Sequence, residues 1–225
     1  MNHLLDNIVW HALSGPQKKF SVRTDEIRRF APGFSPIIGF PNPESPNFYE
    51  LIPFCESGEH FYCGEWSGPA PEGWQIEEES TMFRMVWEGA VPADNDADGA
   101  VQLGPQHATQ ALELATLTRP GPFGLRTIEL GDYFGFFEGG RLLAMGGERF
   151  YAGSYREISG VCTHPDFQGR GFARRLMNKL IRRQIQRSET PFLHVMRDNT
   201  LARDLYKRMG FLDYCETVVR VISRL

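Results

Sequence analysis

The segment spanning residues 161–174 constrains the fold more than any other part of the chain. It passes from an alternating strand pattern through Gly169 and Gly171 into a long amphipathic helix pattern. Glycine permits positive φ angles, and the loop that it forms presents backbone N–H groups where the helix dipole is positive. A pyrophosphate group suits such a loop. Because glycine turns also occur as plain connections, other matches have to decide its role.

Helix and strand patterns alternate through residues 99–225. Apolar periodicity predicts helices over 106–116, 171–187 and 199–209, and strands over 134–138, 141–150, 156–163, 192–197 and 217–222. Gly139 and Gly140 separate the first two strands and predict a β-hairpin. The expected fold class is therefore α/β in the α+β sense.

The pattern in residues 1–98 is weaker, because this part is rich in Pro, Gly and aromatic residues. We expect helices over 24–30 and 47–55 and a strand over 80–86. The polar stretch 92–99 is the best candidate for a boundary. It divides the chain into an acidic, aromatic-rich segment or subdomain (1–98) and a second domain (99–225).

Composition and cysteine usage indicate a globular, cytoplasmic protein. The charged fraction of 23% is ordinary for a globular chain of 225 residues. Cys55, Cys63, Cys162 and Cys215 lack the dense spacing of a disulfide scaffold, which favours a reducing compartment. Neither the N-terminal pattern nor any apolar run predicts a signal peptide or a membrane partner.

Charge is distributed unevenly between the two halves. Residues 1–98 carry 6 Lys and Arg against 16 Asp and Glu, a net charge of −10, whereas residues 99–225 carry 18 against 12, a net charge of +6. A basic half suits a polyphosphate or nucleic acid, and an acidic half facing the same cleft would favour a cationic amine. Solvated surface charge explains the same counts equally well.

The glycine loop and four other features carry a resemblance to a known family. The loop Gln168-Gly-Arg-Gly171-Phe-Ala173 resembles the cofactor loop of the GNAT superfamily of N-acetyltransferases, with Ala173 where glycine is commoner. Asn199 opens a helix, Tyr206 follows seven residues later, and Gly210 and Phe211 begin the return strand. Glu157 lies eleven residues before Gln168. The resemblance covers residues 128–219 firmly and extends to 101, but no motif in residues 1–92 takes part.

The resemblance implies a mixed, mostly antiparallel sheet with a bulge-split central cleft flanked by helices. It also implies acetyl-CoA as cosubstrate. Separately, the irregular spacing of Cys55, His60 and Cys63 leads us to expect no metal. The pantetheine arm would occupy the cleft, and the loop would hold the pyrophosphate. The residues implied in cofactor binding are Val161, Cys162, Thr163, Gln168, Gly169, Arg170, Gly171, Phe172, Ala173, Arg174, Asn199 and Tyr206.

The same resemblance implies direct attack of a primary amine on the thioester in a ternary complex. Glu157 is the first candidate for the base, often through a water, and His194 is the second. Tyr206 is the candidate acid for the thiolate. Each of these residues has a plainer alternative role. Glu157 could be a solvated edge carboxylate, His194 a satisfied core histidine and Tyr206 an ordinary buried tyrosine. Asn199 could equally serve as a helix cap.

Other functions are less consistent with the sequence. A dinucleotide-dependent oxidoreductase would need a third glycine where Arg174 stands, and no recognition motif accompanies the basic helix face, so we expect no nucleic-acid partner. Cys162 lacks a recognisable activating histidine, and Cys55, His60 and Cys63 lack a fourth metal ligand. A non-catalytic acyl-CoA sensor and a transferase of longer acyl chains remain as alternatives. The expected acceptor is a small amine or an amino-acid-like molecule, and homodimer formation is left open.

Overall fold

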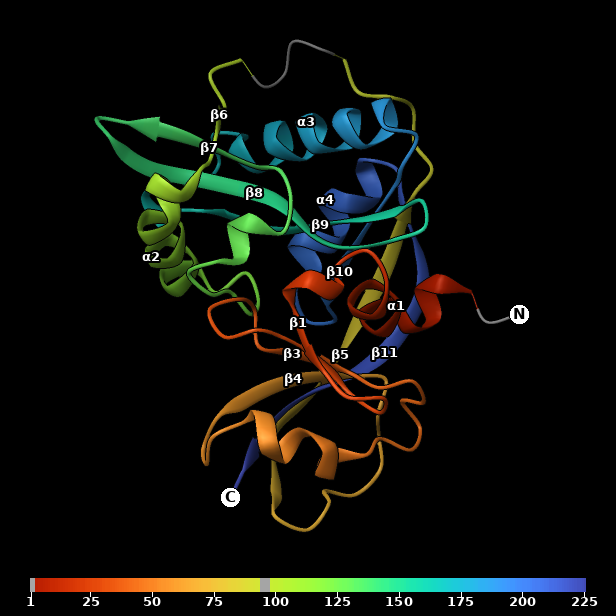
Figure 1. Ribbon diagram of the computed structural model, residues 1–225. Helices are drawn as coiled ribbons and strands as arrows, with labels where there is room; N and C mark the ends of the chain where they lie inside the picture. Colours follow the sequence, from red (N-terminus) through yellow and green to blue (C-terminus); the bar gives the residue numbers. More distant parts are fainter. Residues whose placement is uncertain (1–2, 94–97) are drawn as a thin grey trace.

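The computed structural model describes residues 3–93 and 98–225, and its strands form one curled sheet (Figure 1). The strand order is β1-β2-β3-β4-β11-β5-β10-β9-β8-β7-β6. Neighbouring strands are antiparallel except at two places, where β3 pairs with β4 and β9 pairs with β10 in parallel. The predicted mixed, mostly antiparallel sheet is therefore confirmed.

The elements of the C-terminal half agree with their predicted positions. The strands are β6 (Val101–Gln102), β7 (Tyr133–Glu138), β8 (Arg141–Ala152), β9 (Tyr155–Thr163), β10 (Thr190–Met196) and β11 (Phe211–Arg224). The helices are α2 (Ala108–Thr118), α3 (Phe172–Gln186) and α4 (Thr200–Arg208). The main difference is β11, which is longer than the predicted strand 217–222 because it pairs with β5 along almost its whole length.

The elements of the N-terminal half agree only in part. The predicted helix over 24–30 is wrong, because these residues form the turn and second strand of a hairpin, β1 (Ser21–Arg23) and β2 (Arg28–Phe30). The predicted helix over 47–55 is a 3-10 helix, η3 (Phe48–Phe54). The other elements are η1 (Leu4–Asn7), α1 (Ile8–Ser14), η2 (Lys18–Phe20), β3 (Ile37–Gly39), β4 (His60–Gly64) and β5 (Trp74–Trp87). Strand β5 includes residues 80–86, so the strand predicted there is confirmed.

Strand β5 joins the two halves of the chain. It lies between β10 and β11, so a strand from residues 1–98 separates two strands from residues 99–225. The pairing is extensive, with Phe192–Met196 of β10 opposite Met82–Val86 and with β11 on the other side. The expected boundary stretch 92–99 includes residues 94–97, which lie outside the described part. Residues 1–98 and residues 99–225 therefore both contribute strands to the same sheet.

A bulge and a strand divergence open the middle of the sheet. Between the pairs Met145↔Cys162 and Gly147↔Ser159, β9 has one residue more than β8, and Gly160 adopts a φ of 63° there. Strands β9 and β10 pair only from Thr190↔Tyr155 to Phe192↔Glu157. Beyond those pairs the strands no longer share a ladder. The predicted bulge-split cleft is thus present.

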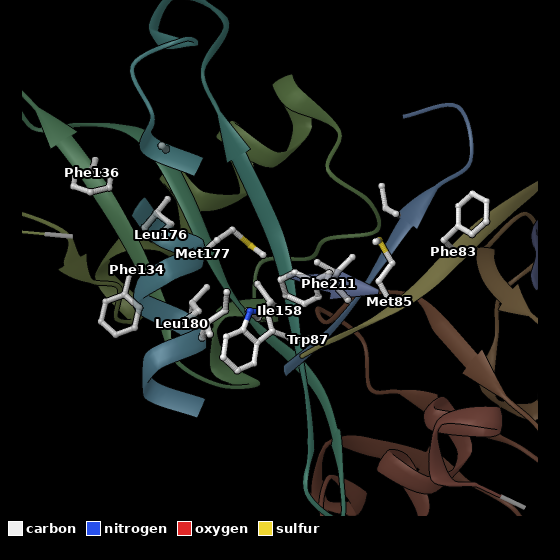
Figure 2. Close-up of a cluster of buried hydrophobic side chains, with 14 residues drawn as sticks. Phe83, Met85, Trp87, Phe134, Phe136, Ile158, Leu176, Met177, Leu180 and Phe211 are labelled. Carbon is white, nitrogen blue, oxygen red and sulfur yellow. The ribbon is translucent and has the colours of Figure 1, made fainter. Parts of the chain in front are cut away.

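The two faces of the sheet are covered by different helices. On one face, α3 buries Leu176, Met177, Leu180 and Ile181 completely, against side chains of β5, β9 and β11 (Figure 2). Burying each such side chain contributes about 1.5–3 kcal/mol. On the other face, α1 packs with Phe150 and Phe192. Ala202 and Tyr206 of α4 pack against the cluster on the α3 face, so α4 flanks the split on that face and the N-terminal segment flanks it on the other.

Candidate active site

A cavity of about 390 Å³ passes through the split between β9 and β10. On the α4 side it is lined by Val195, Ala202 and Tyr206, and on the opposite side by residues of the N-terminal half such as Ile37 and Tyr62. Its size is that of a pocket for a small molecule or part of a cofactor. Because it connects the two faces, a group bound on one side can meet a group bound on the other.

A row of charged side chains crosses the sheet beside this cavity. It runs from Glu65 after β4 through Arg84 of β5, His194 of β10 and Glu157 of β9 to Arg149 of β8. Register explains the contacts, since His194 lies opposite Arg84 and two residues beyond the pair Phe192↔Glu157. Two ion pairs, Glu65 with Arg84 and Glu157 with Arg149, lie on either side of the His194 imidazole. Each buried charge is thereby compensated by a neighbour.

Glu157 is completely buried and fully hydrogen-bonded. Arg149 donates to both carboxylate oxygens, at 2.8 and 2.6 Å, and the Phe150 N–H donates at 3.2 Å. Burial alone would raise the pKa of Glu157, but the charge of Arg149 and the hydrogen bonds from Arg149 and His194 outweigh it and lower the pKa to about 2. The alternative of a solvated edge carboxylate is wrong. With its oxygens engaged, Glu157 is suited to orienting neighbours.

His194 is also satisfied at both ring nitrogens. Arg84 Nε donates to Nε2 at 3.0 Å, so Nδ1 carries the hydrogen and donates to Glu157 Oε1 at 2.7 Å. Burial lowers the pKa of His194, although Glu157 opposes that shift. The ring is therefore a neutral imidazole of fixed tautomer. The lone pair on Nε2 already accepts the hydrogen bond from Arg84, which agrees with the alternative of a satisfied core histidine. The ring nevertheless lines the cavity.

Tyr206 and Asn199 both line the cavity from α4. The Tyr206 hydroxyl makes no hydrogen bond to any described residue, and burial raises its pKa to about 12, so it stays protonated. Asn199 caps α4 through its side-chain oxygen, which accepts from the Ala202 N–H at 3.2 Å. The cap leaves the side-chain NH₂ of Asn199 available. A free phenol donor and a free amide donor thus lie beside the split.

The predicted residues on β9 divide between the two faces of the sheet. Val161 lines the cavity, whereas the Cys162 side chain is buried in a core cluster with α2. Burial raises the pKa of the Cys162 thiol to about 11. Cys162 can therefore contribute only its backbone to a ligand in the cleft. Thr163 ends the strand opposite Ala144 and is not among the residues that line the cavity.

The predicted pyrophosphate loop lies at the surface, outside the cavity lining. Gly169 and Gly171 have φ of 77° and 76°, and a Cβ at either would meet nothing within 4 Å. Helix α3 begins after Gly171 with no side-chain cap, so the N–H groups of Phe172, Ala173 and Arg174 have no partner within the described ranges. Gln168, Arg170 and Arg174 are exposed around them. The loop is open to an anionic ligand.

Three residues of the charged row have no signal in the sequence. Arg84 comes from β5, Arg149 from β8 and Glu65 from the end of β4, and none belongs to a motif. Arg84 is 2% exposed and also donates to the Leu5 carbonyl. Their contacts span up to 110 positions in sequence, so only the folded sheet brings them together. Glu65 stands out locally, because a non-glycine residue with a φ of 67° is unusual.

Other candidate chemistry in the chain is occupied by structural contacts. Cys63 is buried in a core cluster and His60 pairs with Glu77 at 2.6 Å. Among the described residues, no group of three His, Cys, Asp or Glu side chains could hold a metal ion. Over the same residues, no helix combines the length and apolarity needed to cross a bilayer.

Comparisons with known proteins agree with this geometry. The family described as FR47-like protein matches residues 133–221. A crystal structure of a protein from Novosphingobium aromaticivorans DSM 12444, assigned to the GNAT family of acetyltransferases, shares 30% identity with the chain, covers 100% of both chains and superposes with a TM-score of 0.88. The chain belongs to the GNAT family. Membership in this family supports acyl transfer as the general class of reaction.

More distant GNAT structures share the fold over most of the chain. A GCN5-related N-acetyltransferase from Kribbella flavida is 12% identical, with 97% of this chain and 96% of that one covered and a TM-score of 0.60. A GCN5-related N-acetyltransferase-like protein from Streptococcus suis 89/1591 is 13% identical, with 97% and 92% covered and a TM-score of 0.56. At these identities the likeness concerns the fold. No curated protein matches the sequence significantly.

Proposed function

We propose that the chain is an acetyl-CoA-dependent N-acyltransferase that transfers the acetyl group to a primary amine by direct attack in a ternary complex. The observation that carries the proposal is the cavity through the β9–β10 split, with Tyr206 on one side and the charged row on the other. Acetyl-CoA, when bound, supplies an acetyl group activated as a thioester. Four free cysteines fit a cytoplasmic location.

The chain's residues fit this cosubstrate. Residues 159–163 of β9 run past the last pair with β10, so their backbone groups on the cleft side are available to the pantetheine amides. The uncapped N–H groups after Gly171 and the exposed Arg170 and Arg174 suit the pyrophosphate. Asn199 offers its NH₂ group from the cavity wall. Together, these groups would hold the thioester at the split.

We assign proton transfer to residues whose hydrogen-bonding groups are not already engaged. Tyr206 donates its proton to the departing sulfur as the new C–N bond forms and the C–S bond breaks, and it recovers a proton from the amide nitrogen. Glu157 was the first candidate for the base, but a carboxylate with a pKa of about 2 that accepts four hydrogen bonds is a weak proton acceptor. It acts instead as a positioning residue that fixes the tautomer of His194. His194 would have to release Arg84 before accepting a proton.

The test is thiol release from acetyl-CoA with and without a panel of primary amines. We expect release that depends on the amine and that falls when acetyl-CoA is replaced by octanoyl-CoA. Faster release from octanoyl-CoA would assign a longer acyl chain. Saturable acetyl-CoA binding without release towards any amine would contradict the proposal and leave an acyl-CoA-sensing module.

A further inference from the structure

We infer that the half of the cavity on the N-terminal side is the acceptor site, that Glu65 binds the ammonium group and takes its first proton, and that the acceptor is a primary amine on an apolar body. This inference rests on the proposed transferase function and names its substrate class. It also gives residues 1–98 a role in the reaction.

The position of Glu65 carries the first step. Its side chain is 18% exposed and lines the cavity, and Arg84 pairs with only one of its carboxylate oxygens, Oε1. Oε2 has no hydrogen-bond partner among the described residues. Glu65 therefore differs from Glu157, whose two oxygens receive four donors. The cavity wall holds a carboxylate oxygen with room for an N–H donor.

The backbone holds Glu65 in an uncommon conformation. Its φ is 67°, and its N–H donates to the Val218 carbonyl at 2.9 Å. Residues in the left-handed region cost free energy and concentrate at functional sites. Burial raises the pKa of Glu65 against the lowering influence of Arg84, and Asp6 is the other charged group that acts on it, also raising it. A carboxylate tuned upwards accepts a proton from an ammonium more readily than one with a depressed pKa.

The cavity walls around Glu65 indicate which kind of group the acceptor carries next to its ammonium. They are mostly apolar, with Val9, Ile37, Phe40, Met82, Val219 and Val221 among the lining residues. The nearby cations are largely compensated, since Arg84 and Arg149 pair with carboxylates and Arg220 pairs with Glu79 at 2.6 Å. Glu78 adds a second carboxylate to the lining, and the exposed Arg119 lies on the rim. An ammonium on an apolar body matches this surface.

The proton and atom balance is simple. Glu65 takes one proton from the ammonium, the free amine forms its C–N bond, and Tyr206 exchanges the second nitrogen proton for the one it gives to sulfur. Glu65 then returns its proton to solvent. The net reaction consumes an ammonium and a thioester and yields an amide, a thiol and one proton.

The first experiment measures kcat/KM for linear alkylamines from propylamine to hexylamine, with 6-aminohexanoate and ethanolamine as polar counterparts. Each buried methylene is expected to raise kcat/KM about threefold to fourfold until the cavity is filled. Hexylamine should exceed 6-aminohexanoate at least tenfold. Equal values along the series, or a preference for the carboxylate through Arg119, would overturn the inference while leaving the transferase function intact.

The second experiment compares Glu65→Gln with Glu59→Gln. Glu59 pairs with the buried Arg29 in the same half of the chain but does not line the cavity, so it controls for the loss of a buried ion pair. Glu65→Gln should raise KM for hexylamine at least tenfold and remove the acidic limb of the kcat/KM profile, with KM for acetyl-CoA unchanged. Equal behaviour of the two variants would overturn the role of Glu65.

A third variant keeps the inference testable if Glu65→Gln does not fold. Gly64 lines the cavity, and a Cβ there would meet only Met82 Cε at 3.6 Å and the Val218 carbonyl at 3.8 Å, so Gly64→Ala fits without strain. It should weaken hexylamine more than propylamine. Calorimetry of hexylamine binding with CoA present adds a separate readout. If hexylamine binds, Gly64→Ala weakens that binding and no turnover occurs, the result supports the acceptor site and contradicts the transferase function. Unchanged hexylamine binding and turnover in Gly64→Ala would overturn the site.

Discussion

Arg84 Nε donates a hydrogen bond to His194 Nε2 at 3.0 Å, across the antiparallel pair of β5 and β10. Arg84 belongs to the acidic half of the chain and His194 to the half that carries the cofactor loop. The contact therefore ties the two halves together at the cavity. It also fixes the tautomer through which His194 donates to Glu157.

The first prediction concerns the stability of the charged row. Glu157→Gln leaves the guanidinium of Arg149 buried beside a neutral amide, and losing one partner of a buried ion pair costs about 3–5 kcal/mol. Urea unfolding should show this loss. The exposed pair of Arg126 and Glu129 provides the control, since Glu129→Gln should change the free energy of unfolding far less. Equal effects would mean that the row is not a buried network.

The second prediction concerns the pH dependence of stability. Because the pKa of Glu157 is lowered to about 2 from 4.5, the carboxylate contributes stability that is present above pH 4.5 and lost as pH falls towards 2. The loss is on the order of 3 kcal/mol. The pKa of His194 is also lowered, so its contribution decreases as pH falls below 6.5. Denaturant midpoints should therefore decrease on acidification, and a flat profile would contradict this assignment.

Much of the C-terminal half could be predicted because its signals are local. Apolar periodicity located α3, and the glycine pair located the β7–β8 turn. The error at 24–30 arose because Ile27 and Phe30 are three residues apart, which suits a helix face, yet both are buried in the β1–β2 hairpin and its neighbours. Glu65, Arg84 and Arg149 were missed because their roles depend on strand order. No local pattern encodes β5 between β10 and β11.

The third prediction concerns Tyr206. Tyr206→Phe removes a hydroxyl that makes no hydrogen bond to any described residue, so stability should hardly change. If this hydroxyl protonates the leaving sulfur, kcat should fall on the order of 100-fold, as is typical for loss of a general acid, with KM for acetyl-CoA nearly constant. Tyr151→Phe is the control, because the Tyr151 hydroxyl lies outside the cavity lining. An unchanged kcat would remove Tyr206 from the mechanism.

The fourth prediction concerns the bulge at Gly160. An alanine there combines a positive φ with contacts at 3.3 Å to Phe123 and Tyr133, so Gly160→Ala should distort β9 at the split. Gly140→Ala has the same kind of backbone strain, about 1–2 kcal/mol, but a Cβ at Gly140 meets nothing within 4 Å. Calorimetric titration with acetyl-CoA should show weaker binding only for Gly160→Ala. Equal affinities would indicate that the bulge does not shape the cosubstrate site.

The central claim is direct transfer of an acetyl group from acetyl-CoA to an amine. The most direct measurement uses acetyl-CoA labelled with deuterium in the acetyl group, a panel of primary amines, and mass spectrometry of both the amines and the protein. We predict that the label appears as an amide on an amine and that none is bound covalently to the protein. Label retained on the protein, or released only as free acetate with every amine, would contradict the account.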